Sequence, residues 1–160
     1  INMKRLFIFL VLAVLALASF TDKADAQCKQ QLVYQCATQT EKAIYLRDFN
    51  TKLKRDAPDE ETGMKWTVVL NKGTQYRFSL CAPDGFQEQV VLTLYDTEHP
   101  ENSKPYGCTY DKVTKSDRKS FDFICNKTGM YYISIRFKPG EGGKKGCAVG
   151  ILSFVGKSKS

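Results

Sequence analysis

The stretch that decides the fold is KWTVVLNKGTQYRFSLCAPDGFQEQVVLTLYD, residues 65–96. It contains three runs of β-branched and aromatic residues, 65–70, 76–81 and 88–96, and turn residues separate them. The connection NKGTQ suits two antiparallel strands, so we expect 65–70 and 76–81 to pair as a hairpin. Alternation along both runs gives each strand one apolar face, which we expect to point toward a common core.

The later part of the chain repeats this pattern. The runs SFDFIC, residues 120–125, and MYYISIRF, residues 130–137, are separated by NKTG and are expected to form a second hairpin. CAVGILSFVG, residues 147–156, is expected to be the last strand, and a short strand is expected around Cys108. About eight short strands joined by tight turns favour a mostly β protein, an antiparallel β-sandwich or jelly roll, over a parallel sheet.

The segment before the sandwich has a different character. Residues 28–49 lack Pro and Gly, and their apolar residues recur at spacings near three and four, which predicts an amphipathic helix. Its end, IYLRDFNTKL, residues 44–53, fits a first strand equally well. We expect residues 27–64, a helical or extended segment followed by a loop, to pack with the sandwich of residues 65–160 as one domain.

The N-terminus has the pattern of a secretory signal peptide. Lys4 and Arg5 precede an uninterrupted apolar run, residues 6–20, and the polar part that follows ends in ADA just before Gln27. We therefore expect residues 1–26 to be removed on export, which leaves no stable membrane span. The mature protein is expected in the periplasm or outside the cell.

All six cysteines follow the expected signal segment, and an even number in an exported chain favours disulfides over metal ligation. A zinc ribbon needs close C-x-x-C pairs, and no two cysteines here are that close. If residues 28–36 are helical, the first two cysteines are about 12 Å apart, too far to bridge each other. The pairing of the six stays open: Cys28, Cys36, Cys81, Cys108, Cys125 and Cys147.

The chain is basic, with a formal net charge of +7. Outside the cytoplasm, the acidic partners of such a protein are anionic polymers of the cell envelope, glycans and lipid head groups. The lysines are scattered without interleaved aromatic residues, so we expect no nucleic-acid partner. Solubility alone is the alternative explanation of the charge.

The sequence has no recognisable catalytic constellation. Its one histidine, His99, lies in a polar loop, and no G-x-S-x-G motif accompanies it. We expect no catalytic residue, no metal and no cofactor.

Five aromatic residues are candidates for stacking on a sugar ring: Trp66, Tyr106, Tyr110, Tyr131 and Tyr132. Trp66 is expected in the core, and so is one of Tyr131 and Tyr132, because neighbouring strand residues point to opposite faces. Tyr106, Tyr110 and Tyr131 are the predicted ligand-binding residues.

The strands of residues 74–96, 121–137 and 147–154 resemble the bacterial pre-peptidase C-terminal (PPC) domain, a small secreted β-sandwich module. The resemblance covers about residues 65–155 and implies a non-catalytic accessory module of the kind appended to secreted hydrolases. Of the acidic cluster that some members use for calcium, only Asp96 is present. The chain also resembles small exported cysteine-containing proteins of Bacteroidetes-type bacteria, a resemblance that supplies no role.

These observations predict an exported, non-catalytic binding or accessory module that acts on cell-envelope or extracellular glycans. A structural or assembly protein of the envelope is the alternative, and a small secreted hydrolase is the third possibility.

Overall fold

The computed structural model describes residues 23–54, 63–100, 103–141 and 145–158, with side chains from residue 30 onward. The chain forms two four-stranded antiparallel sheets and one helix. Sheet A has the strand order β1-β10-β3-β8, and sheet B has the order β2-β9-β4-β5. The elements are α2 (Lys23–Thr38), β1 (Ile44–Leu53), β2 (Gly63–Leu70), β3 (Thr74–Cys81), η1 (Gln87–Gln89), β4 (Val90–Tyr95), β5 (Gly107–Cys108), β6 (Tyr110–Asp111), β7 (Ser116–Asp117), β8 (Ser120–Ile124), β9 (Gly129–Phe137) and β10 (Gly146–Lys157).

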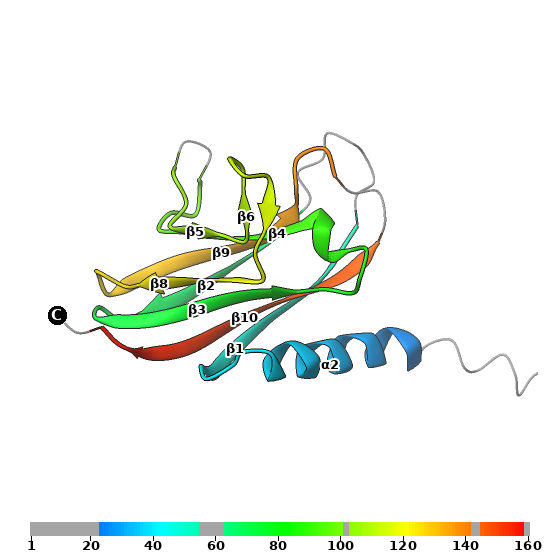
Figure 1. Cartoon of the computed structure of the whole chain (residues 1–160), viewed down its shortest axis with the longest axis horizontal. Helices are drawn as coiled ribbons and strands as arrows, with labels where there is room; N and C mark the ends of the chain where they lie inside the picture. The colour runs from blue at the N-terminus through cyan, green and yellow to red at the C-terminus, as the bar shows by residue number, and fades with distance from the viewer. Residues whose placement is uncertain (1–22, 55–62, 101–102, 142–144, 159–160) are drawn as a thin grey trace, which may run out of the picture.

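The two sheets stack face to face and enclose the main core (Figure 1). In β3, Tyr76, Phe78 and Leu80 are buried, and the residues between them are half-buried on the other face. The same alternation turns Val68 and Leu70 of β2 inward. The mostly β, antiparallel sandwich predicted from the sequence is therefore confirmed, and the apolar faces of the two strands share a core as expected.

The two predicted hairpins are wrong in their pairing. β2 pairs with β9 and β3 pairs with β10 and β8, so β2 and β3 lie in different sheets. β8 and β9 are likewise separated, β8 on β3 and β9 between β2 and β4. Each short turn carries the chain across the core from one sheet to the other. Both arrangements bury the same alternate residues, so alternation does not distinguish them.

The segment of residues 44–53, for which helix and strand were both open, is strand β1. Helix α2 ends at Thr38, and a turn leads into β1, which pairs with β10 at the edge of sheet A. The helix packs on the outer face of this sheet (Figure 1). Leu32 and Cys36 of the helix contact an apolar strip of β10 made of Cys147, Val149 and Ile151. β10 is consequently buried on both faces, which explains its near-continuous apolar run.

One disulfide lies within the part of the chain that the structure describes. Cys36 of α2 bonds Cys81 of β3, with a Cα separation of 5.7 Å, so the disulfide pins the helix to the sheet. The two cysteines expected to be too far apart to bridge each other, Cys28 and Cys36, are accordingly not the bonded pair here. The expectation that every cysteine forms a disulfide is wrong for two of them, since Cys108 and Cys125 carry free thiols. These two lie in different sheet edges, at β5 and after β8, where each thiol contacts hydroxyl or backbone groups instead. The side chain of Cys28 lies outside the described residues.

The predicted signal segment lies almost entirely outside the described residues, which begin at Lys23. Within the described part of the chain, no helix has the length and apolar character needed to cross a membrane.

Aromatic rings close the sandwich where β5 of sheet B meets β8 of sheet A. Phe78 stacks on Phe121 with ring centroids 5.3 Å apart. Gly107 of β5 lies directly against the Phe121 ring, because a Cβ added there would be 2.2 Å from Cε2 of that ring.

We therefore expect Gly107→Ala to destabilise the fold by about 2 kcal/mol, since the ring must leave its stacked position to admit the methyl group. Gly129→Ala is the matched control, because no atom lies within 4 Å of an added Cβ there. The free energies of unfolding in urea check this. Equal stability of the two variants would show that the ring has room to move.

Candidate basic pocket on the outer face of sheet B

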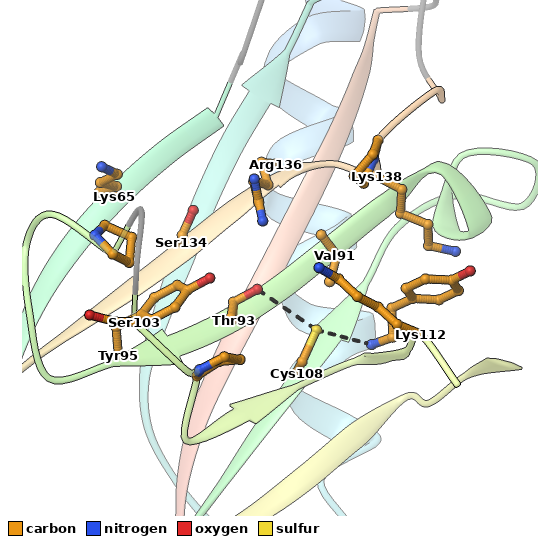
Figure 2. Close-up of a pocket in the computed structure, with 14 residues that line it drawn as sticks. Lys65, Val91, Thr93, Tyr95, Ser103, Cys108, Lys112, Ser134, Arg136 and Lys138 are labelled. Atoms are coloured by element: carbon orange, nitrogen blue, oxygen red, sulfur yellow. Dashed lines mark hydrogen bonds between the residues drawn. The ribbon is translucent and has the colours of Figure 1, made fainter. Parts of the chain in front are cut away.

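The register of sheet B brings together side chains that are far apart in the sequence. Lys65 of β2 and Thr93 of β4 are both directly opposite Ser134 of β9, and Thr93 is also opposite Cys108 of β5. These four residues form one row across the sheet. They lie on its outer face, because the residues next to them on β9 and β4, Ile133, Ile135, Leu92 and Leu94, fill the core. Figure 2 shows the row in place.

The row is the floor of a pocket of about 430 Å³, which we call the basic pocket. Its walls come from the segment between β4 and β7 and from the end of β9. Four of its lining residues are cationic, and within the described part of the chain no carboxylate lines it. The lining residues are Lys65, Val91, Thr93, Tyr95, Pro100, Ser103, Pro105, Cys108, Tyr110, Lys112, Ser134, Arg136, Lys138 and Pro139.

Hydroxyl groups lie between the cations. Ser134 is 7% exposed, and none of the residues described in the structure hydrogen-bonds its hydroxyl. The neighbouring Thr93 hydroxyl is 3.8 Å from the Cys108 sulfur, and that sulfur accepts a bond of 3.4 Å from the Tyr110 backbone N–H. The buried side-chain atoms without a partner among the described residues are Asn50 Oδ1 and Ser153 Oγ, so the Ser134 hydroxyl is open to the pocket that it lines. It is therefore available to hydrogen-bond water or a polar ligand.

Lys138 fixes the wall of the basic pocket. It is only 7% exposed, and its ammonium group donates to the Glu88 carbonyl and pairs with the Asp117 carboxylate. The same nitrogen is 4.6 Å from the centroid of the Tyr110 ring. Tyr110 and Asp117 pair with each other as the two strands of the β6–β7 hairpin, residues 110–117. The one lysine that directly follows β9 therefore holds both strands of this hairpin against sheet B.

The hairpin is also stabilised within itself. The Asp111 carboxylate accepts backbone N–H groups of Val113 and Thr114 at 2.9 and 3.2 Å and pairs with Arg118 at 2.6 Å. These contacts hold the pKa of Asp111 below its ordinary value, the two backbone N–H groups first and the guanidinium after them. The hairpin that carries Lys112 is therefore folded around a carboxylate that stays ionised.

The three predicted ligand-binding tyrosines do not form one surface. Tyr110 lines the basic pocket, with Lys138 over its ring. Tyr106 is 51% exposed but packs against Phe123 and Tyr131 outside the pocket. Tyr131 is 5% exposed and lies in the core, so it presents no surface to a ligand. The expectation that one of two adjacent tyrosines is buried is met by Tyr131.

Tyr131 and Tyr106, whose rings pack against each other, both have raised pKa values. Burial, and next the hydrogen bond with the Cys125 thiol, raise the pKa of Tyr131, whose hydroxyl donates to the Lys127 carbonyl at 2.8 Å. A hydrogen bond of 3.1 Å to the Asp96 carboxylate raises the pKa of Tyr106. Both phenols therefore stay protonated at neutral pH and act as hydrogen-bond donors.

His99 is exposed in the loop after β4, and its backbone N–H donates to the Thr97 hydroxyl at 3.3 Å. Among the described residues, no group of three or more His, Cys, Asp or Glu side chains is placed to hold a metal ion. The chemistry that the site offers is the binding of negative charge by ammonium, guanidinium and hydroxyl groups.

No family model matches the sequence, and no curated protein does either. The resemblance to the PPC family therefore stays a prediction. Among solved structures, the chain is similar to PliG, a periplasmic lysozyme inhibitor of g-type lysozyme from Aeromonas hydrophila. The TM-score is 0.53 at 11% identity, over 73% of this chain and 92% of that one.

A weaker match is the glycosylation-associated protein Gap123 complex of Streptococcus agalactiae. Its TM-score is 0.40 at 16% identity, over 71% of this chain and 44% of the other. At these identities, the similarity to the Aeromonas protein shows a shared fold.

Proposed function

We propose that the chain is an exported, non-catalytic binding module whose basic pocket takes an anionic glycan or an anionic polymer of the cell envelope. The observation that carries the proposal is the lining of the pocket: four cations and several hydroxyls, without a carboxylate among the described lining residues. A volume of about 430 Å³ suits one or two sugar units. The fold shared with a periplasmic lysozyme inhibitor supports a binding role outside the cytoplasm.

A structural role in envelope assembly is the second candidate, and the edge of sheet A favours it. β1 is an edge strand, and its first three residues, Ile44, Tyr45 and Leu46, are exposed apolar side chains. An exposed apolar edge strand is a surface on which another chain can pair. Self-association measured by sedimentation, lost in Ile44→Lys, would support this candidate.

The binding proposal predicts selective and salt-resistant retention on anionic polysaccharide. The purified exported protein is passed over beads carrying phosphorylated, sulfated, carboxylated or neutral polysaccharide, at low salt and at about 1 M, where the screening length is about 3 Å. We expect one anionic polymer to retain the protein at high salt, because charges inside a pocket are screened less than exposed ones.

The variant Lys65→Gln/Lys112→Gln is expected to lose this retention. The control Lys42→Gln/Lys127→Gln removes two exposed lysines outside the pocket and keeps the same net charge as the test variant. If the two double variants lose retention equally, the attraction belongs to the overall charge of the protein, and the pocket has no special part in it.

A further inference from the structure

The floor of the basic pocket combines a charge and a hydroxyl at a spacing that suits an oxyanion. Lys65 and Ser134 are direct partners on adjacent strands, whose backbones are about 4.8 Å apart. Arg136 follows Ser134 by two residues on the same face of β9, about 6.8 Å along the strand. Both side chains are long enough to bring their nitrogen atoms to a group that sits on the Ser134 hydroxyl.

Ser134 supplies a hydrogen bond, the interaction in this site that depends on direction. Its side chain lies in the pocket lining at 7% exposure, and within the described part of the structure its hydroxyl has no hydrogen-bond partner. The core residues Ile133 and Ile135 on either side fix the backbone, so the hydroxyl is held on the pocket face. A hydroxyl held at this position can donate to an oxygen of a bound oxyanion.

The charge of the pocket favours a group with more than one negative charge. Asp117 balances Lys138, whereas Lys65 donates to a neutral acceptor, the Glu98 carbonyl at 3.3 Å. Lys112 adds a further positive charge to the lining. The Coulomb energy grows with the charge of the ligand, so a phosphate ester of charge about −2 gains more here than a carboxylate or a sulfate ester.

The aromatic residues of the pocket leave at most one ring face for stacking, that of Tyr110. Lys138 covers one side of the Tyr110 ring, and Tyr95 is buried. The sugar that carries the anion is therefore expected to contact the pocket through its hydroxyl groups, with Thr93 and Ser103 available on the floor and wall.

We propose that the basic pocket is a phosphosugar site, in which Ser134, Lys65 and Arg136 hold the phosphate ester and the saccharide lies between the floor and the β6–β7 hairpin. This inference rests on the proposed function of the pocket and names the group that it recognises. Arg136 presents a planar fork that suits phosphate oxygens, and Lys65 contributes a point charge.

The test is calorimetric titration of the full chain, purified after export, with four probes: galactose 6-phosphate, galactose 6-sulfate, galacturonate and galactose. The phosphate is expected to bind most tightly. Ser134→Ala should weaken it about tenfold, because a hydrogen bond to a charged group is lost. Ser134→Thr keeps the hydroxyl, and with it the hydrogen bond to the phosphate. Its affinity should therefore be within about threefold of that of the original protein.

Ser79→Ala is the control, because Ser79 is a half-buried strand serine on the outer face of sheet A. Equal phosphate affinity in Ser134→Ala and Ser79→Ala overturns the proposal, as does equal affinity for the phosphate, the sulfate and galacturonate. Retention on anionic polysaccharide without binding of the sugar phosphate leaves the proposed function standing and removes this inference. If neither the polymers nor the probes bind, both are wrong.

Discussion

The double variant Cys36→Ala/Cys81→Ala is expected to lose about 4 kcal/mol of unfolding free energy, because its disulfide closes a loop spanning 45 positions of the chain. Among the described side chains, this bond links helix α2 covalently to sheet A. Without it, the helix is held by the apolar cluster that contains Leu32 and Val149. Urea denaturation of the oxidised protein, followed by circular dichroism, measures the difference.

Cys108→Ala is the control for this experiment, since Cys108 is a half-buried free thiol and its removal breaks no disulfide. We expect Cys108→Ala to lower the unfolding free energy by much less than the double variant does. A loss below about 1 kcal/mol in the double variant would mean that the unfolded chain gains little freedom when the bond is absent. The contacts of α2 would then be sufficient to hold it on the sheet.

The positions of the strands could be predicted from the sequence, and their partners could not. Alternation in β3 marks Tyr76, Phe78 and Leu80 as core residues, because only one face of the strand is buried. It says nothing about which strand lies beside β3, since a turn such as that at Gly73 serves both a hairpin and a crossing between sheets. The burial of β10 on both faces depends on α2, which lies more than a hundred residues earlier in the chain.

The candidate site was less predictable than the fold, for the same reason. Lys65, Thr93 and Ser134 become neighbours only through the register of three strands, and no local motif links them. A signal was present in the run of residues 133–136, Ile-Ser-Ile-Arg, where polar residues alternate with core residues and so share one exposed face. Of the three tyrosines predicted to bind a ligand, only Tyr110 lines the pocket.

The number of cysteines was likewise not enough to predict which of them form disulfides. An even number of cysteines in an exported chain favours pairing, but pairing also needs Cα atoms within about 7 Å and converging side chains. Cys125 is fully buried, and its thiol donates to the Lys127 carbonyl at 3.1 Å, so a local partner already satisfies it. The number of thiols alone does not reveal this.

The buried ammonium of Lys138 connects the fold to the proposed function. It makes three contacts at once, with the Glu88 carbonyl, the Asp117 carboxylate and the Tyr110 ring. A lysine is rarely buried unless its charge is paired. Here two of the three partners, Asp117 and Tyr110, belong to the β6–β7 hairpin, and Tyr110 lines the basic pocket. Through these contacts, the ammonium group joins the segment directly after β9 to the β6–β7 hairpin.

Lys138→Met is therefore expected to destabilise the protein by about 3 kcal/mol and to release the hairpin, since the apolar stem is kept while the charged hydrogen bonds and the cation–π contact are lost. The backbone bond from the residue 138 N–H to the Gln89 carbonyl, 2.8 Å, remains in the variant, so the effect belongs to the ammonium group. Urea denaturation gives the free energy of unfolding, and hydrogen exchange at residues 110–117 reports the release of the hairpin.

Lys112→Met is the control, because it removes an exposed charge from the same hairpin and should weaken ligand binding without speeding exchange. If both variants leave exchange in the hairpin unchanged, the wall of the pocket is held by its internal Asp111 contacts, and Lys138 acts only as one more positive charge.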